Sequence, residues 1–159
     1  MRRSERAVSD PQIIQEILHR AKVMHIGLVD QGDPYVVPVN FGYTYENDRL
    51  TLYFHSAISG RKMDIIKENP TVFCTITVAD SLKGGGDNAC SYSYYYASIM
   101  GQGRAMRLTG KEEKIAALDL LMEHQTGRKG FSYGDSSLSR LSVIRIELDN
   151  FTVKMNAKE

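Results

Sequence analysis

The segment from residue 50 to residue 70, LTLYFHSAISGRKMDIIKENP, constrains the fold more than any other part of the chain. Apolar and polar residues alternate over residues 50–55, which predicts a strand with one apolar face. A turn of small residues at 56–59 leads into a helix at about residues 60–69, because the residue before Pro70 is pushed out of the α region. The segment therefore predicts a strand, a tight turn and a short helix.

The start of this predicted helix is suited to hold an anion. Free backbone N–H groups and the positive end of the helix dipole favour a phosphate there. Ser56 offers a hydroxyl, and Arg61 and Lys62 can add charge-assisted hydrogen bonds. An ordinary strand–helix unit with solvated basic residues would show the same pattern, so the phosphate site needs support from the rest of the chain.

Composition limits the kinds of partner. With 159 residues, 42% hydrophobic and 25% charged, the chain fits one soluble globular domain over residues 1–159. A net charge of +1 gives no general attraction to nucleic acid or to a membrane. No apolar run of transmembrane length and no signal-peptide pattern is present. Cys74 and Cys90 form no metal or redox motif, so a reduced, cytoplasmic setting is expected, although a disulfide between them stays open.

The first part of the chain predicts a helix and a β-hairpin. Asp10 and Pro11 are typical of a helix start, and an apolar stripe follows them. Residues 23–41 form two predicted strands around a turn at 30–34. Pro38 lies in the second strand and indicates an edge or a bulge, because proline cannot donate to a ladder.

Downstream, the patterns predict further antiparallel strands. A polar turn at 46–49 leads into the strand at 50–55, and we expect it to close a three-stranded meander. Later strands are expected at 71–78, 92–107 and 141–149. Gly101 and Gly103 indicate a bulge or a close approach of two backbones.

Two segments between these strands differ in character. Residues 79–91 contain three glycines, Gly84–Gly86, but lack the Lys-Ser/Thr and the helix start of a phosphate loop, so a flexible loop is expected. Thr109 and Glu112 predict the capping box of a helix that ends at Gly127. Antiparallel strands with three helices among them predict a mainly β, α+β fold, a small closed or nearly closed barrel.

The order of these pieces resembles a known family. DPYVVPVNFGY, then LYFHSAISGRK, then YASIMGQG followed by a helix, is similar to the flavin-binding split barrels of the pyridoxamine-phosphate oxidase-like superfamily, and most of all to the nitroimidazole-resistance (Nim) flavoproteins. The most specific part is HSA-x-x-GRK about a dozen residues after PVNF. The resemblance implies a six-stranded antiparallel split β-barrel with flanking helices, a homodimer, and FMN at the subunit interface. The segment GGGDNACSYSYY departs from the family pattern.

The resemblance also implies which residues contact the cofactor. Around the phosphate it places Ser56, Arg61 and Lys62, with Ala57 of the same motif as a further contact. Along the isoalloxazine edge and the ribityl chain it places Pro38, Val39, Asn40, Tyr53 and His55. Asn40 lies on the same strand face as Pro38 and offers an amide. Ser98 would reach the flavin bound mainly by the partner subunit.

His55 is the candidate catalytic residue. In Nim-like proteins the histidine of this motif sits at the active pocket, and a neutral imidazole can donate a proton to a reduced nitro group near neutral pH. The alternative is that His55 only hydrogen-bonds the cofactor or a backbone group. The four histidines have no metal-ligand spacing, and no metal site is expected.

The leading functional hypothesis is an FMN-dependent reductase. NAD(P)H would reduce the flavin, which would pass electrons to a small acceptor such as a nitroimidazole or another nitro or quinone compound. A pyridoxamine-phosphate oxidase-type oxidase would need a second basic set, for which Arg104, Arg107, Arg128 and Lys129 are available. A third possibility is a module that binds haem or flavin without turnover, with His55 or His25 as an iron ligand.

Overall fold

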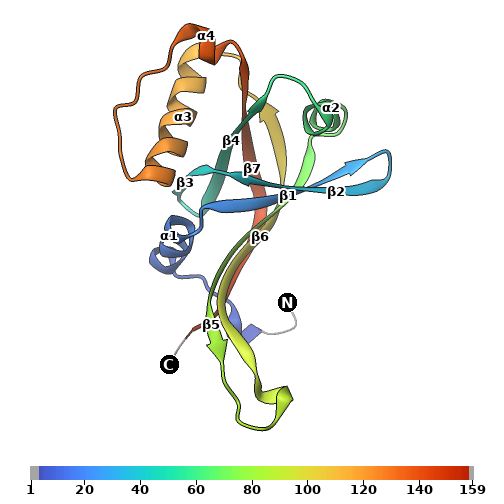
Figure 1. Cartoon of the computed structure of the whole chain (residues 1–159), viewed down its shortest axis with the longest axis vertical. Coiled ribbons are helices and arrows are strands. Elements are labelled where there is room, and N and C mark those ends of the chain that lie inside the picture. The colour runs from blue at the N-terminus through green and yellow to red at the C-terminus, as the bar shows by residue number, and fades with distance from the viewer. Residues whose placement is uncertain (1–3, 158–159) are drawn as a thin grey trace.

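A computed structural model describes residues 4–157 of the chain, which form a curled sheet with helices packed around it (Figure 1). The helical elements are η1 (Ser4–Arg6), α1 (Pro11–Arg20), α2 (Arg61–Glu68), η2 (Ala89–Ser91), α3 (Lys111–Thr126) and α4 (Asp135–Leu138). The strands are β1 (Val23–Asp30), β2 (Asp33–Asn40), β3 (Gly42–Glu46), β4 (Arg49–Ala57), β5 (Thr71–Lys83), β6 (Ser93–Arg107) and β7 (Leu141–Asn156).

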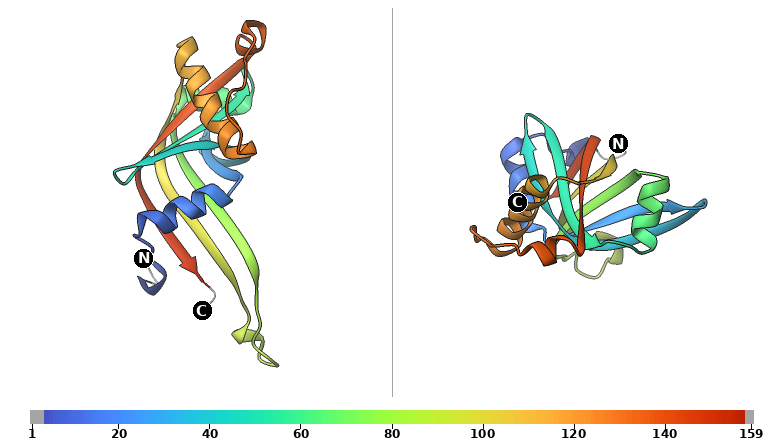
Figure 2. Two further views of the ribbon diagram at one scale, coloured as in Figure 1. Left: turned by 90° about the vertical axis from the view of Figure 1, so that its left-hand side faces the viewer. Right: turned by 90° about the horizontal axis from the view of Figure 1, so that it is seen from above.

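The seven strands form one antiparallel sheet in the order β2-β1-β5-β6-β7-β4-β3. β2 and β3 stand at opposite ends of this order, yet only Phe41 separates them in the chain. The sheet must therefore curl until the end of β2 comes close to the start of β3, as Figure 2 shows from above, but within residues 4–157 these two strands do not pair and the barrel is not closed. The mainly β fold with flanking helices is confirmed, and its shape is consistent with a split barrel.

Two details of the predicted sheet are wrong. Residues 4–157 form seven strands and not six, because the fully buried Phe41 divides the stretch before β4 into β2 and the separate strand β3. The three-stranded meander does not form, because β4 pairs with β3 and β7 while β2 pairs with β1. Local patterns found the strands, but pairing between distant segments decided their neighbours.

The core fills the inside of the curl. Alternate residues of every long strand point inward, and the fully buried ones include Met24, Ile26, Phe54 and Ile144. The predicted close approach of two backbones at Gly101 and Gly103 is confirmed. A Cβ on Gly101 would lie 2.6 Å from the carbonyl oxygen of Asn150, and the β6–β7 register shifts at Gly103.

The helices begin and end close to their predicted positions. Asp10 caps α1 by accepting a hydrogen bond from the Gln12 backbone N–H at 2.8 Å. α3 starts one residue later than predicted. The Gly110 backbone N–H donates a hydrogen bond to Glu113 Oε2 at 3.3 Å, and Glu112 does not take this part. Within residues 4–157, no helix has the length and apolarity needed to cross a membrane.

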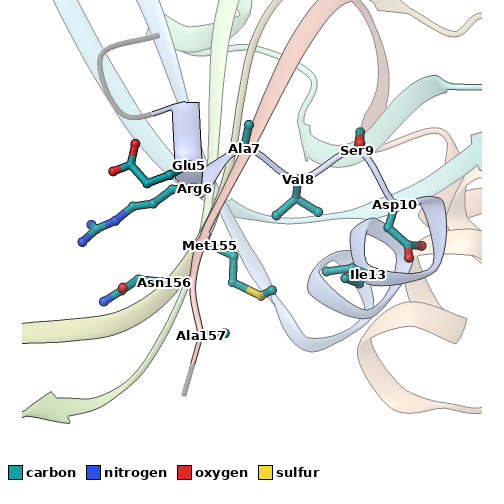
Figure 3. Close-up of a pocket in the computed structure, with 10 residues that line it drawn as sticks. All are labelled: Glu5, Arg6, Ala7, Val8, Ser9, Asp10, Ile13, Met155, Asn156 and Ala157. Atoms are coloured by element: carbon teal, nitrogen blue, oxygen red, sulfur yellow. The ribbon is translucent and has the colours of Figure 1, made fainter. Parts of the chain in front are cut away.

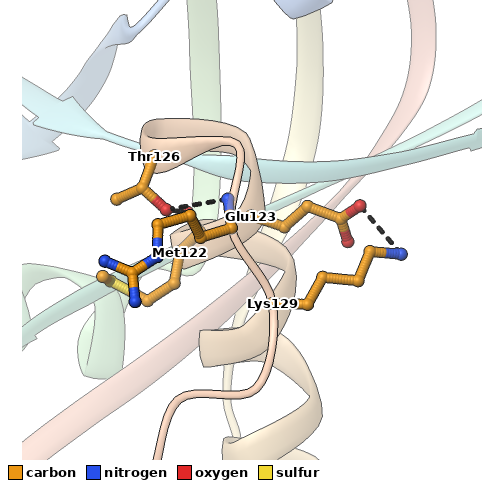
Figure 4. A network of polar contacts seen from close by, with 5 residues as sticks. Met122, Glu123, Thr126 and Lys129 are labelled. Carbon is orange, nitrogen blue, oxygen red and sulfur yellow. Dashed lines mark hydrogen bonds and ion pairs between the residues drawn. The ribbon is translucent and has the colours of Figure 1, made fainter.

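α3 ends at Gly127, as predicted, with this glycine in the left-handed region at φ 70°. Thr126 closes the last turn: its hydroxyl donates to the Met122 carbonyl at 2.6 Å and accepts from the Arg128 N–H at 3.1 Å (Figure 4). An ion pair of 2.9 Å between Lys129 and Glu123 ties the following loop to the helix.

β5 and β6 continue together beyond the rest of the sheet as a projecting arm (Figure 2). The predicted flexible loop at 79–91 is wrong in its first part, because β5 extends to Lys83 and pairs with β6 across a bulge near Ala79 and Ser81. Both cysteines are free. Cys74 lies in the core, where burial raises the pKa of its thiol to about 12, and Cys90 is exposed near the arm tip.

His124 of α3 contacts both α1 and the residue between β2 and β3. Its Nδ1 lies 2.6 Å from the Phe41 carbonyl oxygen, and its Nε2 lies 2.9 Å from that of Leu18. Two carbonyl acceptors favour the imidazolium, but burial lowers the pKa more than these contacts raise it, and the nearby Lys22 ammonium adds to the lowering. The folded chain therefore binds a proton at His124 less readily than the unfolded chain does.

We expect the free energy of unfolding to fall as the pH drops below about 6.5, where the unfolded chain takes up a proton that folded His124 resists. His124→Gln, which cannot titrate, should flatten this part of the profile measured by urea unfolding between pH 7.5 and 5. His19→Gln, at an exposed position of α1, controls for loss of a histidine. If the free energy of unfolding of His124→Gln depends on pH as steeply as that of the wild type, the assignment of this pH dependence to His124 is refuted.

Candidate functional site

The ten predicted site residues lie on β2, β4, α2 and β6. β2 is at one end of the strand order, so Pro38 stands on an edge as predicted, paired in register with His25. Pro38 and Asn40 are exposed on the outer face of the sheet, whereas Val39 packs against the core. The Asn40 Nδ2 donates to the Lys22 carbonyl at 3.0 Å and to Gln125 Oε1 at 3.1 Å, so its donors are used within the chain.

β4 runs two residues further than predicted, so Ser56 and Ala57 belong to the strand and not to the turn. Because side chains alternate along a strand, Ser56 shares the inner side with Phe54, while His55 faces outward. Tyr53 lies on the same outer side as His55 and packs against the second hydrophobic cluster, under α3. Ser56 and His55 thus point to opposite faces of β4.

The start of α2 carries both predicted cations, but they have different surroundings. Gly60 precedes the helix at φ 128°, a conformation that favours glycine, and no side chain of residues 4–157 caps the helix start. The Arg61 Nε donates to Asp30 Oδ2 at 2.7 Å, and its guanidinium lies 4.3 Å from the centre of the Tyr35 ring. Arg61 is therefore tied to the β1–β2 hairpin.

Lys62 has no such partner. Its ammonium lies 5.5 Å from the centre of the Phe54 ring, and its side chain is half-buried. Among residues 4–157 no carboxylate forms an ion pair with it. Burial lowers the pKa of Lys62, since water is removed from the charge without a counterion to replace it. An anion at this point would restore the lost stabilisation.

The phosphate of a flavin mononucleotide fits this arrangement. The Lys62 ammonium, the uncapped first turn of α2 and the Ser56 hydroxyl, two residues beyond Phe54 on the same side of β4, are all hydrogen-bond donors. The acidic residue of that turn, Asp64, is exposed. The donor set therefore matches an anion and offers nothing that a divalent metal would require.

Ser98 lies far from this group within one chain. It is half-buried on β6, in register with Thr77 on one side and Lys154 on the other. His55 is in register with Val143, eleven residues from Lys154 along β7, a separation of roughly 36 Å at ~3.3 Å per residue. A single chain does not bring Ser98 to β4 and α2.

Several cavities among residues 4–157 lie outside the predicted set, two of them at the ends of β7 and β6. One, of about 650 Å³, lies between the segment before α1 and the end of β7, and Figure 3 shows its lining, which includes Arg6, Asp10 and Met155. The other, of about 480 Å³, lies between α2 and the end of β6. None of the ten predicted residues lines either cavity.

The second cavity was not predicted from the sequence. Arg104 and Arg107 were noted as cations but were not brought to Lys67 and Met63 of α2, which line the same space. The signal for this cavity in the sequence was the pair of arginines at the end of a predicted strand. It was not enough, because no local pattern shows which helix will cover them. Arg128 and Lys129, grouped with them in the sequence, instead lie after α3, with Lys129 bonded to Glu123.

Comparison with known proteins identifies relatives of the whole chain. Residues 10–155 match the family described as pyridoxamine 5'-phosphate oxidase. The chain is similar to a proposed 5-nitroimidazole antibiotic resistance protein from Bacteroides thetaiotaomicron, with 37% identity over 93% of this chain and 85% of the other, and a TM-score of 0.78. No curated protein matches.

More distant structures share the fold. The flavocytochrome Anf3 from Azotobacter vinelandii is 20% identical over 99% of this chain and 72% of its own, with a TM-score of 0.81. An FAD- and haem-binding protein from Mycobacterium smegmatis is 15% identical over 96% of this chain and 74% of its own, with a TM-score of 0.82. The family match over residues 10–155 and the 37% identity to the resistance protein show that the chain belongs to the pyridoxamine 5'-phosphate oxidase-like family.

Proposed function

We propose that the protein is an FMN-dependent reductase that takes electrons from NAD(P)H and passes them to a small acceptor, such as a nitroimidazole or another nitro or quinone compound. The observation that carries the proposal is the half-buried Lys62 ammonium without an ion-pair partner in residues 4–157. When bound, FMN would supply the hydride and electron transfer, and the protein its binding and orientation. Similarity to a proposed 5-nitroimidazole antibiotic resistance protein supports a nitro compound as the acceptor.

The chain's own part is to hold and orient the cofactor. Lys62 and the first N–H groups of α2 would bind the phosphate, and Ser56 would add a hydroxyl. Arg61 would act by fixing the hairpin, since Asp30 and Tyr35 already hold its guanidinium. The exposed edge of β2 at Pro38 would leave backbone groups for the flavin ring.

Anaerobic stopped-flow measurements test the reaction directly. The FMN-loaded protein, mixed with NADH or NADPH, should lose its flavin absorption, which should return when a 5-nitroimidazole is added. A bound flavin that neither nucleotide reduces would overturn the reductase assignment.

We further propose that two copies complete the site as a homodimer. The outer face of β2, β1 and β5 exposes large apolar side chains: in register across Gly27, Val36 is 59% and Phe73 is 46% exposed, and Met100 on β6 is 39% exposed. A contiguous exposed apolar face is typical of an interaction surface. A partner seated there would also bring its own Ser98 toward this chain's cofactor site.

Phe73→Glu should convert a wild-type dimer into a monomer in sedimentation experiments, because it places a charge on the proposed interface. The matched variant Leu82→Glu, on the exposed part of the arm, should remain dimeric. A wild-type protein that carries FMN and sediments as a monomer would contradict the shared site.

His55 is proposed as the proton donor to the reduced acceptor. Its ring is exposed on the outer face of β4, and no hydrogen bond holds it within residues 4–157, so it is free to meet a ligand. His55→Ala should keep FMN and its reduction by NAD(P)H, but slow acceptor reduction on the order of a hundredfold. His25→Ala, an exposed histidine on β1, is the control. Equal rates of acceptor reduction in wild type and His55→Ala would show that His55 is not the proton donor.

A haem- or flavin-binding module without turnover is the second candidate. Two relatives of the same fold are described as a flavocytochrome and as an FAD- and haem-binding protein. Exposed His25 and His55 offer imidazoles for iron on this chain. A haem band in the purified protein would favour this candidate over the reductase.

A further inference from the structure

The cavity between α2 and the end of β6 lies on the side of α2 away from Arg61. Met63 and Lys67 line it, and at 3.6 residues per turn they lie on the opposite side of the helix from the Arg61 side chain. The other lining residues are Asp64 and Ile66 of the same helix, two residues of the turn before α2, Pro70, and the last four residues of β6. The space, about 480 Å³, is within the size range of small-molecule sites.

Charge in this cavity is predominantly positive. Lys67, Arg104 and Arg107 line it against the single carboxylate of Asp64. None of these three cations takes part in an ion pair within residues 4–157. Glu147, which faces Arg104 in the β6–β7 register, is held instead by Arg145 at 3.1 Å. The cavity therefore keeps unneutralised positive charge.

The walls between these cations are apolar. Met63, Ile66 and Ala105 are buried there and form an apolar surface. Ile58 and Met106 line the same cavity, and they are 43% and 47% exposed. Exposed large apolar side chains around a cavity are typical of a site that binds a partly apolar ligand.

We propose that this cavity binds a small organic anion, a carboxylate or phosphate monoester with an apolar body, at a site separate from the one built around Lys62. Lys67, Arg104 and Arg107 would supply the positive charge that binds the anionic group, since guanidinium and ammonium groups suit carboxylates and phosphates. The apolar body would contact Met63, Ile66 and Met106. The site does not depend on the proposed FMN chemistry, because its lining residues are not those that hold the cofactor.

Isothermal titration of the purified full-length protein, saturated with FMN, with phenyl phosphate tests the proposal, because bound FMN blocks the Lys62 site that a phosphate monoester could also enter. We expect saturable binding of one molecule per chain, at least tenfold weaker in the double variant Arg104→Gln/Arg107→Gln. Arg49→Gln removes the same kind of charge at the far end of β4 and should change the affinity less than twofold.

Three results would overturn the proposal. The first is no saturable binding of phenyl phosphate up to about 10 mM. The second is binding that the double variant leaves unchanged. The third is equal weakening by Arg49→Gln, which would assign the effect to net charge. Inorganic phosphate, which lacks the apolar body, should bind more weakly than phenyl phosphate, and equal affinities would contradict the apolar part of the site.

Discussion

Lys62→Ala is expected to weaken FMN binding by about 1.5–3 kcal/mol, roughly ten- to 150-fold, the usual range for a hydrogen bond to a charged group. The ammonium lies half-buried at 5.5 Å from the Phe54 ring, and no carboxylate pairs with it in residues 4–157. A bound phosphate would be its counterion. Fluorescence titration with FMN measures the change.

The same variant should not lower the free energy of unfolding of the cofactor-free protein. Burial lowers the pKa of Lys62, so the charge is disfavoured in the folded chain, and its removal breaks no ion pair. This combination, lost affinity with retained stability, is what a ligand-binding lysine shows and a structural one does not. Lys67→Ala, on the same helix but in the other cavity, is the matched control and should leave FMN affinity unchanged. Equal FMN affinity in wild type and Lys62→Ala would refute the phosphate site.

Gly42→Ala is expected to destabilise the fold by on the order of 3 kcal/mol, at the upper end of the usual range for overpacking. A Cβ at this position would lie 2.5 Å from the Cα of Leu121 and 2.7 Å from the carbonyl carbon of Leu120, both backbone atoms of α3. Side chains can turn away from a new atom, but a helix backbone must shift as a whole. α3 carries His124, so its contacts with Phe41 and Leu18 would be lost with the shift.

Urea unfolding of Gly42→Ala and of Gly84→Ala measures this effect. Gly84 lies in the turn of the arm, where a Cβ would meet nothing within 4 Å, and its φ is not positive. Its replacement should change the free energy of unfolding by less than about 1 kcal/mol. Similar values for the two variants would show that α3 does not pack on β3 as closely as described.

Local patterns in the sequence predicted most elements of the fold. The alternation around Phe54, the cap at Asp10 and the helix end at Gly127 each depend on neighbouring residues, and all three were confirmed. The strand order could not be read in this way, because it depends on contacts between distant segments. The prediction of a flexible loop from residue 79 failed for the same reason. Pairing with β6, and not composition, makes residues 79–83 part of β5.

The candidate site shows the same division. The motif around Arg61 and Lys62 indicated an anion site, but the sequence did not show that Asp30 would hold Arg61 and leave Lys62 alone. It also did not show that the strand would continue through Ser56 and turn its side chain to the face opposite His55. Both facts depend on where β4 ends and on which hairpin lies beside α2.

The visible absorption spectrum of the purified protein, with identification of the chromophore released by denaturation, tests the central claim most directly. The account predicts a flavin spectrum, or its appearance on adding FMN, and the release of FMN itself. A haem band, or a colourless protein that fails to take up added FMN, would contradict it.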